Sequence, residues 1–415
     1  MQGSTTHLST AAFPRGLALL FLFVLATGRA ALAFQTRNLG YNQLGAPSRS
    51  VHPSSPRHSM LMSSSATSQS FTTKVGVTLK DYLDEQIEKD RIDRGLYDVM
   101  MAVAESCIDV SYSLKTHSLK TRFSDVSTTV NVQGEQQKRM DVLANAIFIG
   151  NLKCVNAVAA MASEEEETVL YGNGNGNGIS SYEIAFDPLD GSGNLDVNLP
   201  TGSIFGIAPF DRNGFDRPFS RQGSALVASG YALYSSSTEL VLSFGTDHPD
   251  GVVGFTLDES WYDDKRTFVF KLSRIGIRCP PHGPYYSLNE AREPDWPIGL
   301  TRWIADAKRG QTPSGRTYSS RYVCSLCADL HRTLLDGGWA GNPRKHLRLL
   351  YEAAPLAFLI EAAGGRGTDG TRELMAIEPC GLHDRVCVFL GSTEDIADLQ
   401  SYGDIQQLQA KRYDA

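Results

Sequence analysis

The chain has 415 residues, 41% of them hydrophobic, and a formal net charge of -7. This length and apolar content suffice for one large domain or two ordinary domains with a proper core. Residues 1–70 contain five arginines and no acid, so removing these five positive charges takes the net charge from -7 to -12. Such an acidic body argues against nucleic acid as a partner.

Residues 1–71 have the character of targeting sequence. Arg15 precedes a short apolar run, and Ala31-Leu32-Ala33 supplies an A-x-A cleavage site, so the sequence predicts a signal peptide over residues 1–33. Residues 34–71 are rich in Ser and Arg and lack acids, which is typical of a transit peptide. This order resembles the bipartite presequence of complex plastids and predicts a chloroplast-stroma protein; secretion with a disordered pro-segment is the alternative. The apolar run is too short to span a bilayer comfortably, so no membrane attachment is expected for the mature protein.

Hydrophobic periodicity predicts helices at both ends of the folded part and strands between them. Two helices are expected within residues 79–115, separated near 93–95, and a third over 134–153 with Met140, Leu143, Ile147 and Ile149 on its apolar side. Apolar runs predict strands at 182–186, 204–209, 224–234, 238–244, 251–257, 268–272 and 385–391. Further helices are expected at 296–308, 325–335, 355–363 and 393–399. Strands this close in sequence favour hairpins, so we predict an α/β fold with two mixed sheets between helix layers.

The mature chain is expected to form two domains, residues 72–273 and residues 274–415. The alternation of Gly and Asn over 172–178 lacks the strand-to-helix context of a nucleotide-binding loop and is interpreted as a flexible insertion. The seven cysteines are odd in number and widely spaced, which does not indicate a disulfide framework. Cys324 and Cys327 form a single C-x-x-C, which we interpret as two core-facing cysteines, with a redox pair as the alternative.

A short apolar run leads into the most informative stretch of the chain, Asp187-Pro-Leu-Asp190-Gly-Ser. Pro188 fixes φ and Gly191 permits a tight reversal, so the two carboxylates can point into one space. Like charges at close range repel unless cations lie between them, and carboxylates suit Mg²⁺ or Mn²⁺. The glycine-rich turn that follows offers backbone N–H groups to a phosphate. The stretch therefore predicts metal-assisted phosphoryl chemistry; an acidic surface turn is the alternative.

Other candidate groups are scattered along the chain. Glu164 and Glu165 follow the small apolar run 157–162, at the end of a predicted strand, and Glu352 lies close in sequence to the cation Arg348, so these acids could complete a metal site. For the glutamate run that begins at Glu164, a solvated run of charges is the alternative. Asp141, within a predicted helix, is by itself more typical of an exposed acid. His331-Arg332 is interpreted as a packed, paired structural unit.

Taken together, these motifs resemble class I fructose-1,6-bisphosphatases, in the group that also contains sedoheptulose bisphosphatases. The matching blocks occur in family order from residue 79 to the C-terminus. Upstream and around the aspartate motif they are Asn131-x-x-Gly134, Asp141-Val-Leu-Ala-Asn145 and Ser163-Glu-Glu165. Downstream they are Tyr286-Ser-Leu-Asn-Glu290, Arg321-Tyr-Val, Ala328-Asp-Leu-His-Arg-Thr333 and Leu347-Arg-Leu-Leu-Tyr-Glu352.

The resemblance implies an αβαβα layered fold, a homotetramer, and a Mg²⁺-dependent phosphatase of plastid carbohydrate metabolism (Calvin cycle or gluconeogenesis). It implies two or three Mg²⁺ per site, with Mn²⁺ as an alternative. The implied metal ligands are Glu164, Glu165, Asp187, the carbonyl of Leu189, Asp190 and Glu352. Asp141 with Glu165 would orient and deprotonate the attacking water. The implied substrate-binding residues are Gly191, Ser192 and Arg348 for the 1-phosphate, and Asn289, Tyr322 and, from a neighbouring subunit, Arg321 for the 6-phosphate.

The sequence departs from the family pattern on the distal side of the substrate. Arg292 and Asn342 stand where the family usually has phosphate-binding tyrosines, and His346, retained as a predicted substrate ligand, stands where it has Lys. No metal ligand is changed. Sedoheptulose 1,7-bisphosphate therefore stays open as the substrate. A catalytically weak regulatory paralogue is a further alternative, although a complete carboxylate set costs stability without metal. An inositol-phosphatase-like enzyme is disfavoured because the chain has no late Trp-Asp-x-Ala motif.

Two regulatory features of the resembled family are expected to be absent. The loop before the second helix reads Ile92-Asp-Arg-Gly-Leu96, and Ser181-Tyr182 stands where AMP-regulated members have Lys-Tyr, so AMP inhibition is not expected. The segment 210–223 contains no cysteine, so the redox loop of plant plastid members is not expected either.

Overall fold

The computed structural model describes residues 75–120, 139–172, 181–211, 217–262 and 265–408. The chain divides into two compact units, Met1–Ala66 and Thr67–Ala415, and every described residue belongs to the second. The predicted signal and transit peptides, and the matching block at 131–134, lie outside the described residues. Among the described helices, none has both the length and the apolar character that a membrane span requires.

Three helices open the described part of the chain: α1 (Leu79–Glu88), α2 (Arg94–Lys120) and α3 (Arg139–Lys153). The predicted break near 93–95 is confirmed, since α2 begins at Arg94 and the Asp93 carboxylate accepts a hydrogen bond from the Leu96 amide over 2.7 Å. The predicted apolar side of α3 is partly wrong. Leu143 is 43% exposed, whereas Ala144, Phe148 and Leu152 are buried, because the sheet contacts the stripe of positions four residues apart.

An eight-stranded sheet lies beneath these helices in the order β10-β7-β6-β5-β4-β3-β1-β2. Its strands are β1 (Val158–Ser163), β2 (Leu170–Tyr171), β3 (Tyr182–Asp190), β4 (Thr201–Pro209), β5 (Ala228–Tyr234), β6 (Thr238–Ser243), β7 (Val252–Asp258) and β10 (Val269–Ile277). Only the β1–β3 pair is parallel, so the sheet is mixed, as predicted. The strand expected over 224–234 starts later, after a 3-10 turn, η3 (Gly223–Ala225).

A five-stranded sheet follows in the order β12-β11-β13-β15-β14. Its strands are β11 (Tyr285–Ser287), β12 (Ser319–Ser320), β13 (Trp339–Arg348), β14 (Arg366–Thr368) and β15 (Arg385–Gly391). β11 pairs in parallel with β12 and β13, whereas β15 pairs antiparallel with β13 and β14, so this sheet is mixed as well. A separate hairpin joins β8 (Trp261–Tyr262) to β9 (Lys265–Arg266).

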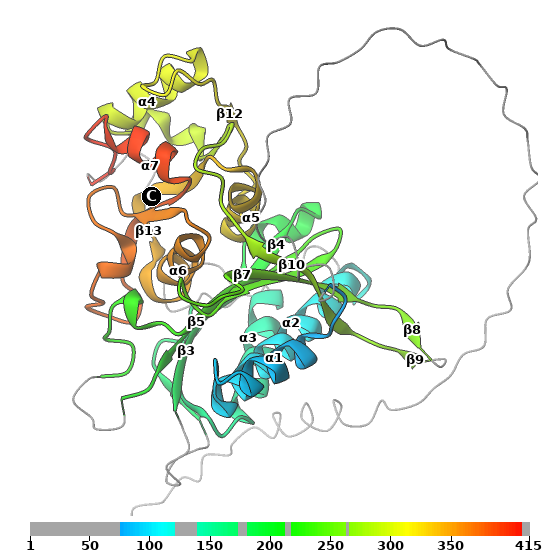
Figure 1. Cartoon of the computed structure of the whole chain (residues 1–415). Helices are drawn as coiled ribbons and strands as arrows, with labels where there is room; N and C mark the ends of the chain where they lie inside the picture. Colours follow the sequence, from blue (N-terminus) through cyan, green and yellow to red (C-terminus); the bar gives the residue numbers. More distant parts are fainter. Residues whose placement is uncertain (1–74, 121–138, 173–180, 212–216, 263–264, 409–415) are drawn as a thin grey trace, which may run out of the picture. The chain divides into compact units, whose positions relative to one another are not determined.

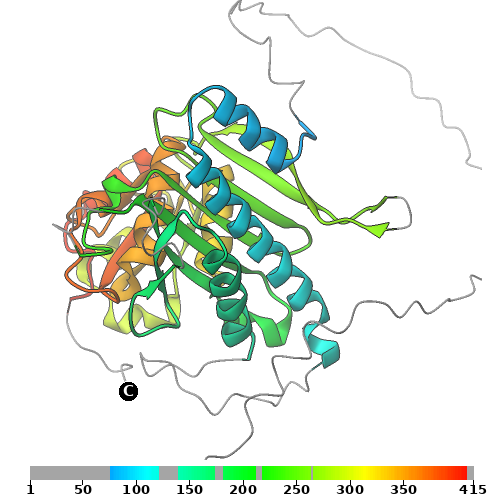
Figure 2. The same cartoon turned by 90° about the horizontal axis from the view of Figure 1, so that it is seen from below.

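The remaining helices are α4 (Ile298–Arg309), α5 (Leu326–Asp336), α6 (Ala354–Ala362) and α7 (Thr393–Gln400), with short turns η2 (Ser192–Val197), η4 (Glu290–Asp295), η5 (Leu349–Ala353) and η6 (Leu374–Ala376). Helices α1, α2 and α3 cover one face of the large sheet (Figure 2). Helices α5 and α6 share an apolar cluster with both sheets, and α4 and α7 cover the far face of the small sheet (Figure 1). The predicted αβαβα layering is confirmed.

Two predictions about particular residues have different outcomes. His331 and Arg332 are packed and paired as expected: the Tyr231 hydroxyl and His331 Nδ1 are 2.7 Å apart, and Arg332 contacts Asp329 over 2.9 Å. The interpretation of two core-facing cysteines is wrong for Cys324. This residue is exposed and has φ 64, because the chain reverses just before α5, whereas Cys327 inside the helix is fully buried. The division at residues 273 and 274, which lie within β10, stays a prediction.

Candidate active site

Two parallel strands deliver the first acids to one edge of the large sheet. Ser163 at the end of β1 is in register with Phe186 of β3, and the Glu164 amide donates to the Phe186 carbonyl over 3.2 Å. Asp187 and Asp190 follow at the end of β3, whose nine residues are all buried. Since parallel strands end at the same edge, the two acidic segments meet there although they come from separate parts of the sequence.

A third buried carboxylate comes from η5, a π-helical turn before α6. Single oxygens of Asp187, Asp190 and Glu352 lie within 4.8 Å of one another, and the three residues are 3%, 8% and 5% exposed. Burial, followed by the nearby Glu164 carboxylate, raises the pKa of Asp187 and of Glu352 well above the ordinary range. Acids that resist ionisation for this reason are stabilised by a cation among them. The donor set consists of hard oxygens, which fit a divalent metal such as Mg²⁺.

One guanidinium is built into this cluster. Arg348 is 3% exposed; its amide donates to Glu352 over 2.6 Å and its Nη2 atom lies 3.4 Å from Glu164. A buried arginine can bind two phosphate oxygens at once while its charge is balanced by neighbouring acids. Arg348 is therefore placed to hold an anion beside the carboxylates.

Helix α3 brings Asp141 to the same place. Asp141 is 5% exposed, so its interpretation as an ordinary surface acid is wrong. One turn later Asn145 receives a hydrogen bond from the Ser163 hydroxyl over 2.7 Å and donates to Glu166 over 2.7 Å. The Ser163 hydroxyl in turn accepts from the Glu165 amide over 3.3 Å. This chain of hydrogen bonds fixes the acidic segment after β1 against the helix that carries Asp141.

The turn after Asp190 is held against the start of α5. Gly191 has φ 74, and a Cβ atom there would lie 2.7 Å from the Cβ of Ser325, so the position requires glycine. The Ser325 hydroxyl donates to Asp190 over 2.6 Å, and the Cys327 amide donates to the same oxygen over 2.9 Å. Ser325 is not among the site residues predicted from the sequence, although a serine just before an apolar helical run is a helix-capping signal.

A cavity of about 490 Å³ collects these groups. It is lined by the predicted residues Asp141, Glu164, Glu165, Asp187, Leu189, Asp190, Gly191, Ser192, Asn289, Tyr322, His346, Arg348 and Glu352. Arg321 does not line it: its guanidinium lies 5.4 Å from the Tyr285 ring and donates to the Ser320 carbonyl over 2.8 Å.

The wall of the cavity contains basic as well as acidic side chains. Arg292, from η4, and Arg344 and His346, from the irregular part of β13, line it together with the acidic cluster. The three positions that depart from the family pattern, Arg292, Asn342 and His346, therefore all lie in the cavity wall. A carboxylate cluster that can bind a metal ion and several basic side chains line one cavity. Such a cavity fits a ligand with two anionic groups, one bound through the metal and one by the basic side chains.

Comparison with known proteins agrees with this geometry. The sequence model "Fructose-1-6-bisphosphatase, N-terminal domain" matches residues 77–263, and "Fructose-1-6-bisphosphatase, C-terminal domain" matches residues 279–404. A chloroplastic fructose-1,6-bisphosphatase of Pisum sativum is 36% identical over 79% of this chain and 83% of its own length. The chloroplastic enzyme of Brassica napus is 38% identical over 78% and 81%.

Solved structures give the same answer. The crystal structure of Leishmania major fructose-1,6-bisphosphatase in holo form is 30% identical and covers 79% of this chain and 99% of that one, with a TM-score of 0.71. Both family domains match in order, and together they span well over half of the chain. The chain therefore belongs to the fructose-1,6-bisphosphatase family.

Proposed function

We propose that this protein hydrolyses the 1-phosphate of fructose 1,6-bisphosphate to fructose 6-phosphate and phosphate, using two or three Mg²⁺ per site, with Mn²⁺ as a possible substitute. The observation that carries the proposal is the buried carboxylate cluster in the same cavity as Arg292, Arg344 and Arg348. Family membership supports it, because the family's named members are phosphoric monoester hydrolases.

The metals would be held by Glu164, Glu165, Asp187, the carbonyl of Leu189, Asp190 and Glu352. When bound, they would lower the pKa of a water molecule and neutralise charge on the phosphoryl group. Asp141 and Glu165 orient that water and take its proton. Ser192, the Gly191 amide and Arg348 hold the 1-phosphate in line for attack, so the protein contributes mainly positioning and electrostatic stabilisation.

Different residues would hold the remote phosphate. Asn289 and Tyr322 bind it within one subunit, and His346 lies on the same side of the sugar. The exposed Arg321 reaches the site of a neighbouring subunit in a homotetramer. Sedoheptulose 1,7-bisphosphate is the second candidate substrate, because Arg292, Asn342 and His346 change this part of the cavity. The protein is proposed to work in plastid carbohydrate metabolism, after import into a complex plastid through its bipartite presequence.

Metal dependence tests the proposal directly. Phosphate release from fructose 1,6-bisphosphate is expected to stop when EDTA removes divalent ions and to return when Mg²⁺ is added, because Asp187, Asp190 and Glu352 lose their counter-ion. Unfolding temperature followed with and without Mg²⁺ provides the parallel measurement, and Mg²⁺ should raise it. Unchanged release in EDTA would contradict the proposed chemistry.

AMP is expected not to inhibit at micromolar concentration. The start of a helix attracts phosphate, but at α2 the Asp93 carboxylate already accepts from the Leu96 amide over 2.7 Å. Burial and the same carboxylate raise the pKa of Tyr182 nearby, so this hydroxyl stays neutral. A second negative charge here would be repelled. Titrating AMP at fixed substrate measures the effect, and micromolar inhibition would show that the prediction is wrong.

Thiol redox state is expected to leave activity unchanged. Cys327 is fully buried in α5, and a Cβ atom on Gly202 would lie 2.4 Å from its sulfur, so a reagent has no access to it. Cys324, by contrast, is exposed, so only one of the two cysteines is accessible to a reagent. Phosphate release should be equal after dithiothreitol and after oxidised dithiothreitol. A reversible loss in the oxidised sample that Cys324→Ser abolishes would indicate a redox pair instead.

A further inference from the structure

A segment beyond the matched family domains forms part of the active-site wall. The C-terminal family match ends at residue 404, yet Gln407 lines the cavity. The Gln407 amide donates to the Pro343 carbonyl over 2.8 Å, and Gln407 forms a parallel β-bridge with Arg344. Pro343 and Arg344 line the same cavity. The segment therefore joins the wall at the irregular part of β13, beside the backbone of Arg344.

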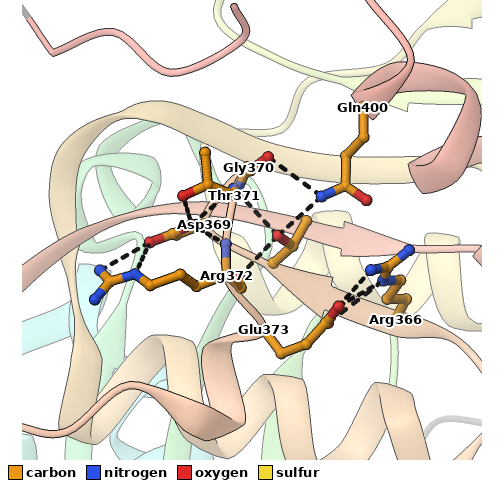
Figure 3. A network of polar contacts seen from close by, with 8 residues as sticks. Arg366, Asp369, Gly370, Thr371, Arg372, Glu373 and Gln400 are labelled. Carbon is orange, nitrogen blue, oxygen red and sulfur yellow. Dashed lines mark hydrogen bonds and ion pairs between the residues drawn. The ribbon is translucent and has the colours of Figure 1, made fainter. Parts of the chain in front are cut away.

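Neighbouring contacts fix this segment in place. The Gln406 side chain donates to the Asp369 carbonyl over 2.7 Å. Asp369 belongs to the tight turn shown in Figure 3, where its carboxylate accepts from the amides of Thr371 and Arg372 over 2.9 and 2.7 Å. Ile405 is 1% exposed and packs in the same apolar cluster as Trp296. These contacts, just before Gln407, hold the backbone that leads into its side chain.

Ser287, Trp296 and Gln407 of this wall each have a buried polar atom without a hydrogen-bond partner by strict geometry among the described residues, and the Ser287 hydroxyl is accounted for by its interaction with the Asp329 carboxylate. Two such atoms remain. They are the indole Nε1 of Trp296, which is 9% exposed, and the amide Oε1 of Gln407, which is 6% exposed. Trp303 and Trp339, in the same apolar cluster as Trp296, also have unpaired indole N–H groups, but neither of them lines the cavity. Trp296 and Gln407 differ from them because both residues line the cavity.

The chemistry of the two atoms indicates what they bind. An indole N–H only donates, and an amide oxygen only accepts, whereas a hydroxyl group does both. A hydroxyl also satisfies the Gln407 amide if its oxygen and nitrogen are exchanged. Two arginines of the same wall are suited to phosphate: Arg344, whose backbone bridges to Gln407, and Arg292 of η4, the turn that Trp296 caps. The neighbourhood thus fits the phosphorylated end of a polyhydroxylated ester.

We propose that Trp296 and Gln407 form a hydroxyl-binding subsite that positions the sugar end remote from the carboxylate cluster and so contributes to substrate specificity. This inference rests on the proposed function, since it assumes a sugar bisphosphate in the cavity. A ligand that lacks the hydroxyl would leave the polar atoms of the subsite without a hydrogen bond, so the subsite would disfavour binding of such a ligand.

Four variants of the purified protein test the subsite. Trp296→Phe and Gln407→Leu each remove the unpaired group and keep the side-chain bulk. Trp303→Phe removes an equivalent unpaired N–H away from the cavity, and Leu408→Ala alters the exposed neighbour of Gln407 without touching the cavity wall. With Mg²⁺ and fructose 1,6-bisphosphate, KM should rise about threefold to tenfold in the first two variants and stay within about twofold in the controls.

Inhibition by inorganic phosphate distinguishes a loss of substrate positioning at the subsite from a general disturbance of the active site. The proposed function places the released phosphate with Ser192 and Arg348 beside the carboxylates, so its inhibition constant should not change in Trp296→Phe or Gln407→Leu. Unchanged KM, or an inhibition constant that rises as much as KM, would overturn the subsite while leaving the proposed function intact. If the unaltered protein releases no phosphate from either sugar bisphosphate, the proposed function fails, and the subsite fails with it.

Discussion

Replacing Asp190 with asparagine is expected to lower kcat roughly hundredfold or more while the protein stays folded. Asp190 is 8% exposed and one of its oxygens lies within 4.8 Å of oxygens of Asp187 and Glu352, so the change removes one negative ligand from the proposed metal site. The asparagine oxygen can still accept from the Ser325 hydroxyl and the Cys327 amide, which now donate to Asp190 over 2.6 and 2.9 Å. The turn should therefore be preserved.

Stability gives the second readout for this variant. Burial raises the pKa of Asp190 above its ordinary value, so a charged carboxylate at this position destabilises the metal-free protein. Without metal, the Asp190→Asn protein should therefore unfold at a higher temperature than the unaltered protein. With Mg²⁺ the order should reverse, because the unaltered protein gains more from the ion. Asp196→Asn, in the exposed part of η2, is the matched control and should change neither property. Wild-type turnover by the Asp190 variant would show that the site is assigned to the wrong residues.

Replacing Arg292 with methionine is expected to lower kcat/KM for fructose 1,6-bisphosphate about tenfold to hundredfold, mainly through KM. The lost group is a charged donor in the cavity wall, and hydrogen bonds to charged groups contribute about 1.5–3 kcal/mol. The reacting phosphate binds elsewhere, so kcat should change little. Arg302→Met, on the exposed side of α4, is the control.

The same assay compares the two candidate substrates. The unaltered protein should release phosphate faster from fructose 1,6-bisphosphate than from sedoheptulose 1,7-bisphosphate if Arg292 and His346 compensate for the missing tyrosines and lysine. A preference for the longer sugar would mean that these residues select it instead. An Arg292 variant with unchanged KM for both sugars would exclude this side chain from substrate binding.

Local sequence patterns determined most of the secondary structure and the chemical character of the site. Apolar periodicity and flanking Gly, Asp and Pro residues predicted β3, α5 and β15, because these signals act between residues that are close in the chain. The Asp187 to Ser192 stretch indicated a metal and phosphate site without any knowledge of the fold, since two carboxylates that point into one space repel each other unless a cation lies between them.

Tertiary contacts decided which faces are buried and which distant residues meet. Asp141 reads as a surface acid within its helix, but α3 packs on the sheet with that side inward and buries it. Cys324 and Cys327 have the same local motif, yet only Cys327 is covered, by contacts with β4. Trp296 and Gln407 show no chemical signal in sequence; they share a wall because α4 and the C-terminal segment pack on one side of the small sheet. Such convergence depends on sheet order and packing over long separations, which local periodicity does not encode.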